Sequence, residues 1–105
     1  MKKINGKNKF GFWEGQPYKS VTDRYEDFIN LKNAISKEKV IAHIESLDSW
    51  LGSTRSHDIF TGEAFNCGFY EDGEFQFPVD FLRYYKTKDI GIPYEYEEYL
   101  KGILK

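Results

Sequence analysis

Apolar and polar residues alternate through the middle of the chain in a pattern that predicts a β-hairpin followed directly by a helix. Every second residue over Phe65–Phe69 is aromatic or the lone cysteine, which is the period of a strand with one buried face. The sequence Asp72-Gly73 is a strong hairpin-turn signal, and the alternation resumes with Phe75 and Phe77. Pro78 cannot donate a ladder hydrogen bond, so it ends the return strand and favours the start of a helix.

Helical periodicity and capping residues predict about four helices along the chain. Their apolar residues recur at intervals of three or four, which places them on one face of each helix. The predicted helices are Val21–Ile35 with Ser20 as N-cap; a segment that starts after the cap Ser36, runs to Leu51 and ends at Gly52; Val79–Tyr85; and a last helix that opens at Pro93, with Tyr96, Tyr99, Leu100 and Ile103 on one face.

The remaining segments read as a loose terminus, a short strand and a loop. Residues 1–9 are basic and polar, so we expect a loosely held N-terminus. A lone hairpin is only marginally stable, so residues 9–14 are a candidate third strand. Residues 52–58 are polar and predict a loop. The sequence therefore predicts a single α+β domain over residues 1–105, in which an antiparallel hairpin or three-stranded sheet packs against about four helices.

The cysteine count and the hydropathy pattern suggest where such a protein works. A single cysteine excludes an intramolecular disulfide, which suits a reducing compartment. No apolar run follows the first residues, and no stretch approaches the roughly 20 apolar residues of a membrane span. We therefore expect a cytoplasmic protein that does not associate with membranes.

Charge is the property that most changes this picture. The net charge is −2, but residues 58–98 carry ten acidic and three basic side chains. Such an acidic surface repels nucleic acid and attracts basic proteins. Aromatic residues form 18% of the chain, enough to fill a small core and still leave tyrosines as anchors at an interface.

No residue pattern in the chain matches a known catalytic or metal site. Cys67 lies on the apolar face of a predicted strand, where a core role is commoner than a nucleophilic one. His43 and His57 lack second ligands at zinc-binding spacing. The acidic residues around Gly73 are too few and too closely spaced for a calcium loop. The sequence therefore predicts no catalytic residue, no metal and no cofactor, and we expect a protein that is not an enzyme.

The overall build and two acidic aromatic segments resemble the immunity proteins of bacterial toxin systems, including those of contact-dependent growth inhibition. The segments are Phe69–Leu82, which reads Phe-Tyr-Glu-Asp-Gly-Glu-Phe-Gln-Phe-Pro-Val-Asp-Phe-Leu, and Asp89–Tyr96, which reads Asp-Ile-Gly-Ile-Pro-Tyr-Glu-Tyr. The resemblance covers about the C-terminal half of the chain. It implies a cytoplasmic inhibitor that binds one cognate toxin, plausibly a nuclease with a basic substrate cleft.

On that reading, an acidic surface studded with tyrosines covers the basic cleft of the toxin. The predicted contact residues are Asp58, Tyr70, Glu71, Asp72, Glu74, Asp80, Tyr84, Tyr94, Glu95, Glu97 and Glu98. One alternative is a small enzyme or ligand-binding domain with a pocket near His57 and Cys67. Another is a nucleic-acid accessory protein that uses the basic N-terminus, although the charge of the chain makes nucleic acid the less favoured partner.

Overall fold

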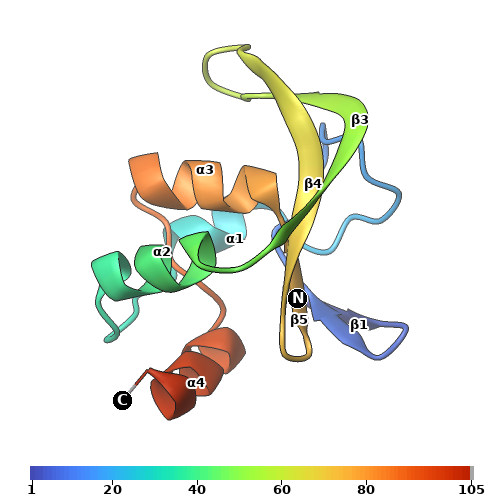
Figure 1. The fold of residues 1–105 in the computed structure, drawn as a ribbon. Coiled ribbons are helices and arrows are strands. Elements are labelled where there is room, and N and C mark those ends of the chain that lie inside the picture. The colour runs from blue at the N-terminus through green and yellow to red at the C-terminus, as the bar shows by residue number, and fades with distance from the viewer. Residues whose placement is uncertain (105) are drawn as a thin grey trace.

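The computed structural model describes residues 1–104, which form one mixed five-stranded sheet and four helices (Figure 1). The strands follow the order β1-β2-β5-β4-β3, and every neighbouring pair is antiparallel except β2 and β5. The α+β class is confirmed, but the sheet has five strands and not the two or three that we predicted. The elements are β1 (Lys2–Ile4), β2 (Lys7–Lys9), α1 (Tyr25–Ile29), α2 (Lys37–Glu45), β3 (Ser49–His57), β4 (Ala64–Asp72), β5 (Phe75–Pro78), α3 (Val79–Thr87) and α4 (Tyr94–Ile103).

The central hairpin and the helix that follows it are as the alternation predicted. β4 and β5 pair with Tyr70 opposite Phe77, and α3 begins directly after Pro78. Local signals suffice here because the turn, the alternation and the proline all specify neighbouring residues. The last predicted helix also forms, with Pro93 as N-cap of α4.

The N-terminal segment is ordered into a hairpin, so the prediction of a loose terminus over residues 1–9 is wrong. Asn5 and Gly6 both have positive φ, at 51° and 79°, which is the backbone of a type I′ turn. The turn joins β1 to β2, and β2 then pairs in parallel with β5. The expected strand at 9–14 is misplaced, because the ladder ends once Phe10 N–H donates to Gln76 and the chain turns away.

The helix predicted for Val21–Ile35 shrinks to the five residues of α1, and Ser20 does not cap it. Its N-cap is Arg24. The chain after α1 is non-helical up to the Ser36 cap of α2. There Asn33 bonds both the N–H and the C=O of Ile92, at 2.8 and 3.0 Å. These contacts lie 59 residues apart in sequence, so helical periodicity cannot reveal them.

The helix predicted from Ser36 to Leu51 ends early, and its second half joins a strand. Ser36 does cap α2, since its hydroxyl accepts the Lys39 N–H, but the helix stops at Glu45. Residues 49–57, expected as a helix end and a loop, form β3 at the edge of the sheet. Pairing with β4 overrides the local helical pattern because it satisfies the backbone of both strands.

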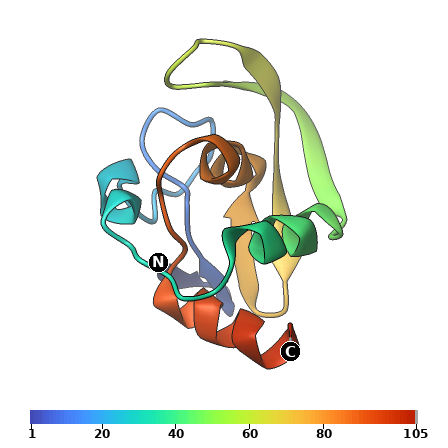
Figure 2. The same ribbon diagram turned by 90° about the vertical axis from the view of Figure 1, so that its left-hand side faces the viewer.

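The core lies between the sheet and the four helices, which stand together on one side of it (Figures 1 and 2). Aromatic rings dominate this core: Phe10 lies 4.8 Å from Phe77 and 5.2 Å from both Phe81 and Tyr96, centroid to centroid. The predicted core face of α4 is correct for Tyr96 and Leu100, whereas Ile103 is 48% exposed. None of the helices among residues 1–104 has the length and hydropathy to cross a membrane.

Candidate functional site

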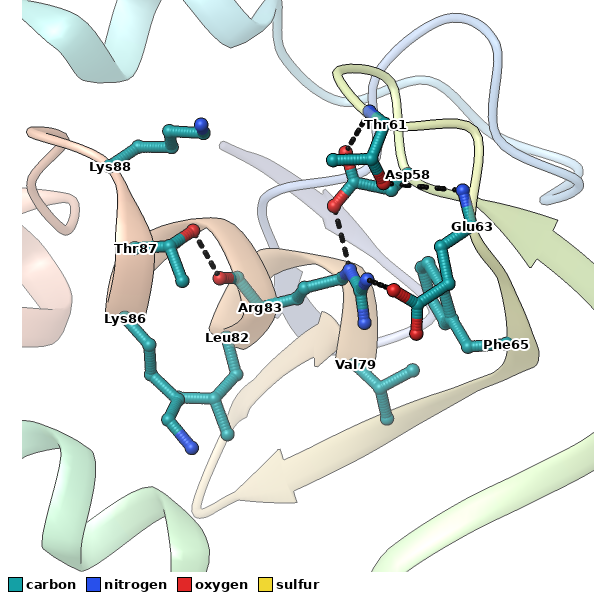
Figure 3. A pocket seen from close by; sticks show the side chains of 10 residues that line it. All are labelled: Asp58, Thr61, Glu63, Phe65, Val79, Leu82, Arg83, Lys86, Thr87 and Lys88. Carbon is teal, nitrogen blue, oxygen red and sulfur yellow. Dashed lines mark hydrogen bonds and ion pairs between the residues drawn. The ribbon is translucent and has the colours of Figure 1, made fainter.

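A cavity of about 620 Å³ opens beside α3, under the loop that joins β3 to β4 (Figure 3). Its floor is apolar and its rim carries charges of both signs. Figure 3 shows Arg83 reaching from α3 toward two carboxylates of the loop. The lining residues are Asp58, Thr61, Glu63, Phe65, Val79, Leu82, Arg83, Lys86, Thr87 and Lys88.

Most charges at the cavity rim form ion pairs within the protein, and the remaining one, Lys88, lies over the Phe60 ring. Arg83 Nε lies 2.8 Å from Asp58 Oδ2, its second nitrogen lies 3.2 Å from Glu63, and its guanidinium stacks over Phe65. Lys86 pairs with Glu45 at 2.9 Å. The ion pairs of Arg83 therefore hold the loop against the helix at this cavity. Arg83 and Lys86 are both paired within the protein and are not free to bind an anion.

Asp58 is thereby a structural carboxylate and not part of an exposed acidic surface. Burial alone would raise the pKa of Asp58, but the hydrogen bonds from Arg83 and from the N–H groups of Thr61 and Phe60 outweigh it and lower the pKa to about 2. In turn, the bond to Asp58 raises the pKa of Arg83. The ionised carboxylate therefore holds the first turn of the loop.

Asp80 is fully buried, which corrects its prediction as a contact residue. Its Oδ2 accepts the Ser56 hydroxyl at 2.5 Å, and its Oδ1 lies 2.8 Å from the Tyr18 hydroxyl. The same hydroxyl lies 2.7 Å from the Gly68 carbonyl and accepts the Gly68 N–H at 2.9 Å. Burial raises the pKa of Tyr18 above its ordinary value. This network joins α3 to β3, β4 and the loop before α1.

Asp72 is also buried, at the end of β4, which corrects its prediction as a contact residue. Its Oδ2 lies 2.7 Å from the Tyr96 hydroxyl and 2.8 Å from His43 Nε2, and its Oδ1 accepts the Tyr99 hydroxyl at 3.1 Å. Burial and the bond to Asp72 raise the pKa of Tyr96. This enclosed carboxylate joins α2, β4 and α4. Both of its oxygens are engaged inside the protein, so it does not face solvent at the turn as a calcium ligand would.

Glu97 and Tyr84 are the last two predicted contact residues that the fold buries. The Glu97 carboxylate accepts the N–H groups of Ala34 and Ile35, at 2.6 and 3.0 Å, and the Asn33 amide. Burial would raise the pKa of Glu97, but these hydrogen bonds outweigh it and lower the pKa. Tyr84 is wholly buried and accepts the N–H of Ile59. Neither side chain can reach a partner.

Five of the predicted contact residues remain exposed, and we call them the acidic end. They are Glu71, Glu74, Tyr94, Glu95 and Glu98; Tyr70, the last of the predicted anchors, is half-buried against Phe77.

The β4–β5 turn and α4, the two segments that carry the acidic end, lie at the same end of the molecule (Figures 1 and 2). Glu71 points to the face of the sheet opposite Asp72 and pairs with Lys7 at 3.6 Å. A Cβ on Gly73 in the turn would lie 2.7 Å from the Tyr99 hydroxyl oxygen, so helix and turn are in contact. Glu95 lies three residues before Glu98 and four residues before Tyr99, so Glu95 shares one side of α4 with both of them. Glu74 and Glu95 form no ion pair with the described residues.

His57 and Cys67 do not form the pocket that the enzymatic alternative required. His57 lies opposite Ala64 and is exposed, whereas Cys67 is buried with its Sγ against Gly52. Cys67 lies three residues beyond Ala64, which is about 10 Å along β4 and on the other face of the sheet. The basic N-terminus of the nucleic-acid alternative is built into β1 and β2, and the aromatic residues Phe10, Phe12 and Trp13 that follow it are buried.

Sequence reasoning missed the two roles played by Tyr18 and His43, because both act through buried carboxylates far away in sequence. It could have found the turn at Asn5-Gly6, which is as strong a hairpin signal as Asp-Gly.

Comparisons with protein-family models, with curated proteins and with solved structures each found no match for this chain. The geometry of the acidic end is therefore the basis for a functional proposal.

Proposed function

We propose that this chain is a toxin-immunity protein that binds its toxin through the acidic end. The observation that supports the proposal is the contact between the β4–β5 turn, which carries the exposed Glu74, and α4, which carries the exposed Glu95, Glu98 and Tyr94. A tyrosine among carboxylates offers a stacking surface for arginine and an acceptor for lysine. A basic nuclease cleft is the partner whose charge such a surface matches.

Buried hydrogen bonds fix the acidic end in position before any partner arrives. Asp72 ties the base of the hairpin turn to Tyr96 and Tyr99 of α4, and Glu97 ties α4 to the segment after α1. A surface that is rigid before binding loses less conformational entropy when the complex forms. The buried and the exposed acids therefore have separate roles, because the first set holds the second in place.

The test uses the product of the adjacent reading frame as the toxin. Co-expression in a bacterial host should restore growth, and the purified pair should bind with an affinity that falls as salt rises. The double variant E74K/E95K should weaken binding at least about tenfold, mainly through the association rate. Both glutamates are exposed and form no ion pair with residues 1–104, so the fold should persist.

The matched control is E26K/E38K, which makes the same change in charge on α1 and α2. It should bind nearly as well as the wild type. Equal weakening by both variants would point to overall charge and would refute a role for the acidic end. A neighbouring gene product that is harmless, or that is neither bound nor neutralised, would refute the immunity function itself.

A further inference from the structure

The edge strand β3 carries the two most exposed large apolar side chains among residues 1–104. Trp50 is 64% exposed and Leu51 is 61% exposed. Neighbouring residues of a strand point to opposite faces, so the apolar pair flanks the free edge on both sides. β3 is last in the sheet order and lies along its outer margin in Figure 1. Such an edge is a template for another strand.

The direction of the backbone groups on this edge follows from the bonds made by Gly68. Its N–H and C=O both bind the Tyr18 hydroxyl, on the side of β4 away from β3. Gly68 is the residue opposite Leu51, so this pair exchanges no ladder hydrogen bonds. Because bonded and non-bonded pairs alternate in an antiparallel ladder, the N–H and C=O groups of Ser49 and Leu51 point to the free edge.

We propose that β3 pairs with β3 of a second copy of this chain, antiparallel and two-fold symmetric about Trp50. In that register Ser49 faces Leu51 of the second copy, and the outward groups of both residues form four hydrogen bonds in all. The two Trp50 residues then face each other as a non-bonded pair, with Cα atoms about 4.5 Å apart. The sheets of the two copies become one sheet of ten strands.

A second copy is the occupant that this edge matches best, because the segment is complementary to itself. Residues 49–54 carry no charged side chain, so nothing there selects a charged partner and self-pairing opposes no like charges. Asp48 would face Gly52 of the second copy. The irregularity in β3 between Leu51 and Arg55 limits the pairing to about three residues, so we expect a weak dimer.

Sedimentation equilibrium of the intact chain tests the proposal. The weight-average mass should rise from one chain to two between low micromolar and millimolar concentration. Trp13 is buried, so a blue shift of the tryptophan emission over the same range reports on Trp50. The variant W50K places two like charges in contact and should stay monomeric. L51P removes an outward N–H donor together with the exposed leucine side chain and should also weaken the dimer.

The matched control I103K adds the same charge at another exposed apolar residue, at the end of α4, and should dimerise as the wild type does. E74K/E95K should dimerise too, so failure here is distinct from failure of the proposed immunity function. A wild-type chain that remains monomeric at millimolar concentration would overturn the proposal. So would W50K and L51P variants that are both folded and dimerise like the wild type.

Discussion

Asp80 has no exposed surface, and both of its oxygens are engaged by the hydroxyls of Ser56 and Tyr18. Removing the carboxylate in D80A leaves the buried Ser56 hydroxyl without its acceptor, and Tyr18 keeps only the Gly68 carbonyl, so we expect the free energy of unfolding to fall by about 1–3 kcal/mol. D80N keeps the shape and one acceptor oxygen, so its loss should be smaller. Urea denaturation measures both, and a D80A variant as stable as the wild type would refute the structural role.

Asp58 makes stability depend on pH because Arg83 and two loop N–H groups bind its ionised form. Its pKa in the folded state is about 2, below the ordinary value of 3.8. A depressed pKa stabilises the fold above the ordinary value, and this contribution is lost as pH falls from about 4 to about 2. We expect D58N to lose up to about 2 kcal/mol at neutral pH and to approach the wild type in acid.

Denaturant titrations at a series of pH values would check this prediction. E63Q is the control, because Glu63 also pairs with Arg83 but is largely exposed. It should change stability by less than about 1 kcal/mol. A gap between the wild type and D58N that stays constant down to pH of about 2 would show that the pairing with Arg83 does not depend on the charge of Asp58.

At the scale of elements, prediction succeeded where the signals and the contacts are both local. The β4–β5 turn, the start of α3 at Pro78 and the start of α4 at Pro93 each depend on neighbouring residues. It failed where a distant segment decides. Residues 30–35 keep a helical pattern in sequence, yet Asn33 and the N–H groups beside it are bonded to Ile92 and Glu97.

Gly91 tests how tightly that segment and the α3–α4 linker fit together. A Cβ there would lie 2.5 Å from the carbonyl oxygen of Leu31 and 2.6 Å from Asn33 Oδ1. Backbone atoms cannot yield as a flexible side chain can, so G91A should lower the free energy of unfolding by about 1–3 kcal/mol. G102A adds the same methyl group to α4 where no atom lies within 4 Å, and it should stabilise by up to about 1 kcal/mol.

Chemical denaturation of the two variants side by side distinguishes crowding from a general effect of the methyl group. Equal and small changes in both would mean that the linker moves away from Leu31 without cost. A large loss in G91A alone would confirm that the non-helical path of residues 30–35 is required by packing.

At the scale of the whole molecule, about half of the predicted contact residues are buried and stabilise the fold instead of facing a partner. Acidic composition alone could not separate Asp72, Asp80 and Glu97 from Glu71 and Glu74, because burial depends on which hydroxyls and N–H groups the fold brings near. Charge patterning therefore overstated the extent of the exposed acidic surface. The exposed remainder is the part on which the proposed function depends.

The N-terminal hairpin completes the sheet through a contact between segments far apart in sequence, since Asn8 lies opposite Phe75. Deleting residues 1–9 removes β1 and β2 and exposes the edge of β5 beside the aromatic core. We therefore expect a large drop in the unfolding midpoint and a loss of cooperative unfolding, measured by near-UV circular dichroism in urea.

G6V, which puts a β-branched residue at a φ of +79°, should give an intermediate loss. K3S changes only an exposed side chain of β1 and should match the wild type. If the deletion unfolds at the wild-type midpoint, the first nine residues are dispensable and the sheet is stable with the three strands β3, β4 and β5.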